Sequence, residues 1–268
     1  MADRRKSHAR PSAARAKGAA GEAPLTDEAR FLAAYDAEEY ERLSVAVDVV
    51  LVSAFEGDLS TLLIRRREHP HRDRWSLPGG FVRTDESLDA AAARVLSQKA
   101  GLGGVFLEQL YTFGDPGRDP RTRVVSVAYY ALVEKGRFVA CAARGNDVST
   151  PRLQVPWPGE EGGPVHAIGP DGRPLTLAFD HESILGVAVK RLRGKLDYAP
   201  IGFQLLGDTF TLFELQRVHE TVLGRRLNKD SFRRRMLGTG QLKPTGKNQT
   251  GTTHRPAELY RFARRSAL

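Results

Sequence analysis

The stretch GGFVRTDESLDAAAARVLSQKAGL, residues 79–102, decides the fold. A pair of glycines comes first, followed by an acidic turn, an Ala/Leu-rich body and a closing glycine. This order predicts a tight turn that leads into a capped helix. Apolar residues recur at helical spacing through the body and predict its buried face: Leu88, Ala91, Val95 and Leu96. The stretch has the length and punctuation of a motif for phosphate chemistry.

Strand patterns lie on both sides of this helix. LSVAVDVVLVSAF (43–55), a short EGDLS turn and TLLIRRR (61–67) predict two paired strands, and RVVSVAYYALV (123–133) predicts another. Residues 148–174 are rich in Gly and Pro and predict a loop with short strands. Strands that flank a helix predict an α/β (α+β) body that extends to about residue 180.

The C-terminal third has a different pattern. DHESILGVAVKRLRGKL (180–196) predicts a helix that connects to a second domain. Thr211 and Glu214 form a capping box that opens a further helix, and DSFRRRML (230–237) predicts a short one after it. Two short strands around a polar tip follow. Helix, turn, helix and hairpin together predict a winged helix-turn-helix domain.

Charge supports the same division of the chain. The predicted parts are a disordered basic tail (1–24), a ligand-binding domain (25–180), a connecting helix (181–199) and a winged helix (200–268). The net charge of the whole chain is +9, with +4 in residues 1–24 and +8 in residues 200–268. A basic C-terminal domain suggests a polyanionic partner, and a solvated basic surface is the alternative that charge alone leaves open. The single cysteine, Cys141, and the lack of a long apolar run indicate a cytoplasmic protein.

The spacing of residues 80–102 resembles the signature of the Nudix family. Framework positions match: Gly80, Glu86, Arg94, Gly101 and Leu102. Glu86 and Arg94 are expected to form an ion pair that braces the loop against the helix. In Nudix hydrolases three Glu on this helix hold Mg²⁺ or Mn²⁺, which require carboxylate oxygens.

Those three metal-binding positions carry other residues in this chain. Val95, Gln98 and Lys99 offer an apolar group, an amide and a cation instead. We therefore expect a degenerate Nudix domain that is not an enzyme, with no catalytic residue, no bound metal and no cofactor.

A second stretch, YTFGDPGRDPRTRVVSVAYYALV (111–133), resembles the part of Nudix proteins that handles ADP-ribose. Arg118 and Arg121, expected to be exposed, are candidate donors to a pyrophosphate. Phe113 is either a ring that stacks on adenine or a core aromatic. The remaining candidates lie at a strand end, in the glycine turn and on the former metal face, and complete the predicted ligand-binding set: Arg66, Gly79, Gly80 and Lys99.

Residues 40–265 as a whole resemble the NrtR family of NAD-related transcriptional regulators, in which a Nudix-like domain precedes a winged helix. Four stretches carry the resemblance: AFDHESIL (178–185), KLDYAPIGFQLL (195–206), FTLFELQRVHETVLGRRLNKDSFRRRML (210–237) and RPAELYRF (255–262). The resemblance implies a homodimeric repressor of NAD biosynthesis or salvage genes. It also implies a palindromic double-stranded operator and release by ADP-ribose or a related nucleotide.

The second helix of a helix-turn-helix enters the major groove of DNA. Phe232 and Met236 are expected to face the core, and Arg235 to lie near the core side. The residues predicted to face DNA lie on that helix and at the tip of the wing: Lys229, Ser231, Arg233, Arg234, Lys247, Asn248 and Thr250. Two alternatives stay open at this point, an active Nudix hydrolase of ADP-ribose-type substrates and a regulator of the same architecture that senses a sugar.

Overall fold

The computed structural model describes residues 26–143, 145, 147–196, 199–251 and 256–263. Its chain divides into two compact units, residues 1–42 and 43–268. The described part of the first unit holds helix α1 (Asp27–Ala34) and the 3₁₀ turn η1 (Ala37–Glu39). Thr26 caps α1 by accepting the backbone N–H of Ala29 at 3.2 Å. The sequence did not predict these two elements, and the basic tail predicted for residues 1–24 lies outside the described residues.

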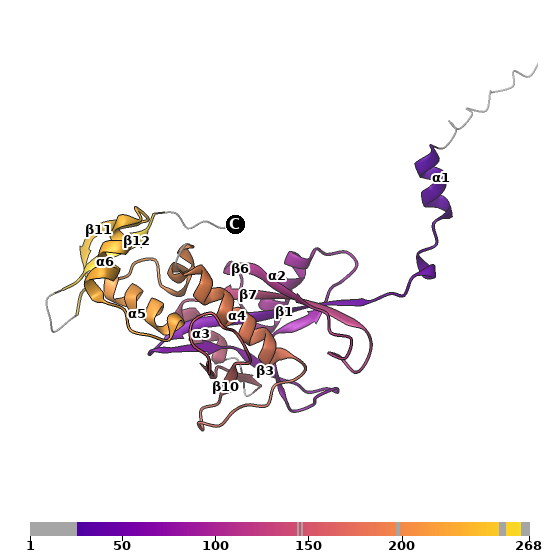
Figure 1. Ribbon diagram of the computed structural model, residues 1–268, viewed down its shortest axis with the longest axis horizontal. Coiled ribbons are helices and arrows are strands. Elements are labelled where there is room, and N and C mark those ends of the chain that lie inside the picture. The colour runs from indigo at the N-terminus through magenta and orange to yellow at the C-terminus, as the bar shows by residue number, and fades with distance from the viewer. Residues whose placement is uncertain (1–25, 144, 146, 197–198, 252–255, 264–268) are drawn as a thin grey trace, which may run out of the picture. The chain divides into compact units, whose positions relative to one another are not determined.

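A mixed sheet forms the centre of the second unit (Figure 1). Within the described residues its strands follow the order β10-β9-β2-β1-β7-β6, with β5 paired to β1. Their bounds are β1 (Ser44–Phe55), β2 (Asp58–Thr61), β5 (Gly79–Phe81), β6 (Phe106–Phe113), β7 (Val124–Leu132), β9 (Arg152–Gln154) and β10 (His166–Ile168). The predicted hairpin between β1 and β2 is confirmed, because Phe55 pairs with Asp58 across a two-residue turn. A second described sheet joins β4 (Trp75–Ser76), β3 (Leu63–Arg65) and β8 (Val148–Ser149).

Both faces of the central sheet are buried, and β1 shows why. Successive side chains of a strand point to opposite faces. Val47, Val49 and Leu51 pack with helices α2 (Leu88–Ala100) and α3 (Lys135–Ala142). Val50, Val52 and Ala54 pack on the other face with α4 (His181–Lys195) and α5 (Leu212–Leu223). A strand that is buried on both sides needs a largely apolar sequence, and residues 45–55 have one that only Asp48 and Ser53 interrupt.

Helix α2 confirms the helix predicted from the opening stretch. Ser87 caps it by accepting the N–H of Ala90 at 3.2 Å, and Gly101 ends it in the left-handed conformation with φ of 67°. Its buried residues include the predicted Ala91, Val95 and Leu96, whereas Leu88 is only partly buried. The glycine pair of β5 lies against β1, so the turn and the helix hold one end of the central strand.

Helix α4, predicted as a connector, packs along the sheet. Ile184, Leu185, Ala188 and Val189 are fully buried in the same core as β1 and β7. The loop that contains Gly163 also lies close to α4. Gly186 permits this contact, because a Cβ there would lie 1.9 Å from the carbonyl oxygen of Gly163. Helix α4 is therefore part of the core of the predicted ligand-binding domain, and it also leads into the winged helix. The predicted domain boundaries stay a prediction.

The winged helix follows. It comprises the 3₁₀ turn η2 (Pro200–Leu205), α5, α6 (Lys229–Gly238) and the hairpin of β11 (Leu242–Asn248) and β12 (Glu258–Phe262). Both halves of the predicted capping box are present, since Thr211 and Glu214 exchange hydrogen bonds of 2.7 and 3.1 Å. The core of this domain contains the predicted Phe232 and Met236 together with Phe203, Phe210, Leu215 and Tyr260.

Candidate functional site

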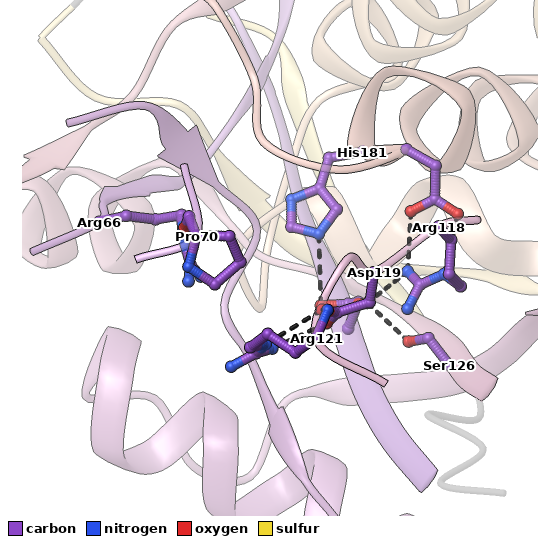
Figure 2. Close-up of polar contacts among 9 residues, drawn as sticks. Arg66, Pro70, Arg118, Asp119, Arg121, Ser126 and His181 are labelled. Atoms are coloured by element: carbon purple, nitrogen blue, oxygen red, sulfur yellow. Dashed lines mark hydrogen bonds and ion pairs between the residues drawn. The ribbon is translucent and has the colours of Figure 1, made fainter. Parts of the chain in front are cut away.

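A cavity of about 240 Å³ opens where β1, β4, β5, the end of α2 and the start of α4 meet. It brings together six of the seven ligand-binding candidates, which come from separate parts of the chain: Arg66, Gly79, Gly80, Lys99, Arg118 and Arg121. Figure 2 labels Arg66, Arg118 and Arg121 and shows their polar contacts. Gly79 is required by a close approach, because a Cβ there would lie 2.1 Å from a carboxylate oxygen of Asp48.

A buried polar network forms the wall of this cavity. Asp48 of β1 accepts the hydroxyl of Ser126 at 2.6 Å. The same carboxylate lies 3.6 Å from Nε2 of His181 and 3.5 Å from the guanidinium of Arg118. These groups come from β1, β7, the 114–123 loop and the first turn of α4, so the network joins the sheet to that helix.

His181 is fully enclosed and uncharged at neutral pH. Burial lowers the pKa of His181, and nearby Asp48 only partly opposes this effect. Its Nδ1 accepts the backbone N–H of Leu77 at 3.0 Å, which leaves the ring proton on Nε2, facing Asp48. The imidazole therefore connects the strand before the glycine turn to the carboxylate at the centre of the network.

Arg118 is buried, whereas the sequence analysis expected an exposed side chain. Its side chain is only 4% exposed, and it donates two hydrogen bonds to Asp180, at 2.7 and 3.0 Å. The expectation of an exposed arginine was wrong, because two carboxylates distant in sequence, Asp48 and Asp180, hold the guanidinium inside the wall. Arg118 thus shapes the cavity, and its charge is already matched.

Arg121 and Arg66 are more accessible cations at the cavity. The Arg121 side chain is 43% exposed, pairs with Asp119 at 2.8 Å and lies 5.4 Å from the ring centre of Phe81. Arg66 donates to the carbonyl of Pro70 at 2.8 Å and lies 4.9 Å from the ring centre of Phe179. Each accessible arginine is therefore placed beside an aromatic ring of the cavity wall.

Phe113 lies away from this cavity, contrary to the stacking role that the sequence left open for it. It packs partly buried against the sheet core, with its ring centre 5.4 Å from that of Tyr111. The aromatic residues that line the cavity are instead Phe81 and Phe179, which the sequence analysis missed. Phe179 has a positive φ of 53°, an unusual conformation for a large side chain, and this turns the chain into α4.

The second candidate surface is the outer face of α6 with the wing. All seven predicted DNA-facing residues are exposed: Lys229, Ser231, Arg233, Arg234, Lys247, Asn248 and Thr250. Asn228 caps the helix by accepting the N–H of Ser231 at 3.0 Å, so the first turn points outward from a fixed start. Arg235 is exposed too and lies 5.8 Å from the ring centre of Phe232. The exposed residues of α6 and the wing thus include five basic side chains, Lys229, Arg233, Arg234, Arg235 and Lys247.

The turn before α6 is fixed by a buried acid. Glu220 of α5 accepts the N–H of Leu227 at 2.9 Å and lies 3.3 Å from Arg226. Gln216 completes the link by donating to the carbonyl of Leu227 at 3.0 Å. Helices α5 and α6 are thus held at a defined angle, as a helix-turn-helix requires.

Comparisons with known proteins identify both domains. Residues 42–155 match the NUDIX domain, and residues 202–262 match the NrtR DNA-binding winged helix domain. The "ADPR responsive transcriptional repressor NtrR" of Acinetobacter baylyi is 35% identical over 241 residues, which cover 89% of this chain and 90% of that protein. This chain belongs to the NrtR family.

Solved NrtR structures share the architecture. The crystal structure of Shewanella oneidensis NrtR superposes with a TM-score of 0.68 at 36% identity, covering 81% of this chain and 93% of that one. The same protein in complex with a 27mer DNA gives a TM-score of 0.68 at 34% identity, with the same coverage. An ADP-ribose pyrophosphatase of Methanocaldococcus jannaschii is 30% identical over 54% of this chain and 73% of its own length. The fold is therefore that of NrtR, a Nudix α/β domain with a C-terminal winged helix.

The Nudix framework of this NrtR-family chain is intact. Arg94 pairs with Glu86 at 2.5 Å and also donates to the carbonyl of Phe81 at 3.0 Å. The hydrogen bonds from Arg94 lower the pKa of Glu86 to about 2. The predicted ion pair between loop and helix is confirmed.

The face of the same helix that carries Val95, Gln98 and Lys99 presents no carboxylate at these three positions. Val95 is buried, and Lys99 donates from Nζ to the carbonyl of Gly79 at 2.5 Å, across the cavity floor. Among the described residues, no group of three or more His, Cys, Asp or Glu side chains is arranged to hold a metal ion.

In the same part of the chain, no helix is both long and apolar enough to cross a membrane.

Proposed function

We propose that this protein is a DNA-binding transcriptional repressor that ADP-ribose, or a closely related nucleotide, releases from its operator. The observation that carries the proposal is the union, in one chain, of a cationic Nudix cavity and an exposed basic recognition helix. The Acinetobacter baylyi relative, named as an ADPR-responsive repressor, aligns with both domains. The family resemblance points to genes of NAD biosynthesis or salvage as the targets.

The cavity has the chemistry for a dinucleotide-like anion. Arg66, Lys99 and Arg121 surround it as positive groups, and guanidinium and ammonium groups are the usual partners of phosphates. Phe81 and Phe179 supply two separate aromatic surfaces, each with an arginine beside it. A ligand with a central pyrophosphate and a ring at one or both ends suits this arrangement, and ADP-ribose has that form.

We further propose that the domain binds this ligand without hydrolysing it. Lys99 occupies the place of a metal-binding glutamate and already bridges to the glycine turn, so a cation would be repelled there. The rival function is hydrolysis, which the archaeal pyrophosphatase relative favours. Incubation with ADP-ribose and Mg²⁺ or Mn²⁺ separates the two. We expect no turnover, and a rate of about 1 per second or faster would establish an enzyme.

The effector class can be tested by thermal shift. A ligand that binds only the folded protein raises the melting temperature by mass action. We expect ADP-ribose to raise the melting temperature of the full chain in the presence of EDTA, and simple sugars to leave it unchanged. Stabilisation by a sugar and not by ADP-ribose would establish the sugar-sensing alternative.

DNA binding implies assembly as a homodimer. Helix-turn-helix proteins usually read palindromes as dimers, with half-sites about one helical turn apart. The expected result of light scattering at micromolar concentration is twice the mass of the 268-residue chain. A monomer that binds one protein per operator would contradict this assembly.

A further inference from the structure

The first turn of α4 is part of the cavity wall. Asp180, its N-cap residue, holds Arg118, and His181, its first residue, holds Leu77 and faces Asp48. A ligand that changes the position of this network acts directly on the start of the helix. The consequence for the rest of the molecule depends on what the other end of α4 contacts.

Arg193 lies near that other end, about 18 Å from His181 at 1.5 Å per residue. It is 5% exposed. Its Nε donates to the carbonyl of Val222 at 3.0 Å, and its Nη1 donates to the carbonyls of Trp157 at 3.0 Å and Gly159 at 2.9 Å. The guanidinium also lies 4.8 Å from the ring centre of Trp157. One side chain thus ties α4 to α5 and to the 157–164 loop.

The hydrogen bond from Arg193 to Val222 is made at the C-terminal end of α5. The last carbonyls of a helix lack partners within the helix and carry a partial negative charge. Val222 is in the last turn of α5, so Arg193 supplies a charged donor to that terminus. In the described part of the chain no carboxylate forms an ion pair with Arg193, and burial lowers its pKa. A buried cation without a carboxylate partner is costly to desolvate, so the directional hydrogen bonds of Arg193 are its main contribution to the structure.

The surroundings of α4 leave little room for independent movement. A Cβ on Gly194 would lie 2.7 Å from a carboxylate oxygen of Glu160, and one on Gly224 would lie 3.0 Å from Nη2 of Arg193. Lys190 donates to the carbonyl of Glu161 at 3.3 Å. The helix and the 157–164 loop therefore pack closely together, and Arg193 connects both to α5 through its hydrogen bond to Val222.

From α5 the path reaches the recognition helix. Glu220 and Gln216 bind both the N–H and the carbonyl of Leu227, in the turn before α6. A displacement of the end of α5 therefore carries α6 with it. This matters because half-site spacing on DNA tolerates little mismatch.

We propose that Arg193 is the positioning residue that transmits ligand binding in the cavity to the DNA-binding domain. The inference rests on the proposed function, since it names how that response is transmitted. Arg193 is buried and lies outside the lining of the cavity. Its loss should therefore separate the two binding events while each event persists.

The test replaces Arg193 by Gln and uses Arg191→Gln as a matched control. Arg191 is two residues earlier on α4 and donates to the carbonyl of Leu110 at 2.9 Å, so it ties α4 to β6 and not to α5. Affinity for an operator duplex from the adjoining promoter is measured by fluorescence anisotropy with and without saturating ADP-ribose. Calorimetry gives the ADP-ribose affinity of each protein without DNA.

In the wild type, ADP-ribose should weaken DNA binding by about 5- to 150-fold. In Arg193→Gln this ratio should fall to near one, while each separate affinity stays within about threefold of the wild type. Arg191→Gln should keep the wild-type ratio. An unchanged ratio in Arg193→Gln would overturn the inference and leave the proposed function standing. If ADP-ribose left the DNA affinity of the wild type unchanged, both the proposed function and this inference would be wrong.

A second measurement needs no variant. Hydrogen exchange of the wild-type protein reports local opening of helix ends. Binding of ADP-ribose should change the exchange of amides 224–227, beyond the end of α5, although they lie outside the cavity. Unaltered exchange there, in a protein that still releases DNA on binding ADP-ribose, would contradict transmission through Arg193.

Discussion

Replacing Arg118 by Ala should lower the free energy of unfolding by about 3–5 kcal/mol. The guanidinium is buried between Asp48 and Asp180, and its removal leaves both carboxylates inside the wall without their cation. Breaking one side of a buried ion pair is far more harmful than removing both sides, because the remaining charge stays desolvated. Urea denaturation followed by tryptophan fluorescence measures the change.

Arg121→Ala is the matched control for this prediction. Arg121 comes from the same loop and pairs with Asp119, but its side chain is 43% exposed, so the loss should be about 1 kcal/mol or less. If the two variants lost the same small amount, Arg118 would be an accessible ligand residue, as its sequence context suggests. The effects on ADP-ribose should also differ. The Arg121 variant keeps a folded cavity with one cation fewer, whereas the Arg118 variant loses the wall itself.

Replacing Arg234 by Ala should weaken operator binding by about 1–3 kcal/mol and relax the sequence preference at one base pair. Arg234 is exposed on the outer face of α6, where a guanidinium can reach guanine O6 and N7 in the major groove. Because Phe232 and Met236 hold the opposite face of α6 in the core, the substitution leaves the fold unchanged. Anisotropy titrations with the operator and with single-base variants measure both effects.

Lys247→Ala is the comparison for the recognition helix. Lys247 is exposed at the wing, where an ammonium group contacts phosphate rather than base edges. Its loss should weaken all DNA sequences alike and reduce the slope of log affinity against log salt by about one. Equal and sequence-independent losses in both variants would contradict the assignment of α6 to the major groove.

Much of the fold could be predicted from local signals. The Nudix spacing of Gly80, Glu86 and Arg94 identified the loop and helix, and the capping box of Thr211 and Glu214 identified the start of α5. Both signals work because the interacting groups are close in sequence. Helix α3 and strand β6 were missed, since their patterns are short and lack strong end signals.

The candidate cavity was predicted less completely, for a physical reason. The burial of Arg118 depends on Asp180, 62 residues later, and on Asp48, 70 residues earlier. Likewise Phe179 reaches the cavity only because α4 packs across the sheet. No local pattern reports such contacts, so the sequence favoured Phe113, which lies in the right stretch but outside the cavity. The other predicted ligand-binding residues line the cavity: Arg66, Gly79, Gly80, Lys99 and Arg121.

The most direct measurement is a titration of the wild-type protein with operator DNA, in EDTA, at increasing ADP-ribose. A cavity whose cations take the place of a metal should bind the pyrophosphate unaided. We therefore expect ADP-ribose to weaken DNA binding by about 1–3 kcal/mol in EDTA. If ADP-ribose has no effect in EDTA but acts once Mg²⁺ is added, a metal-dependent site is present and the central claim is wrong.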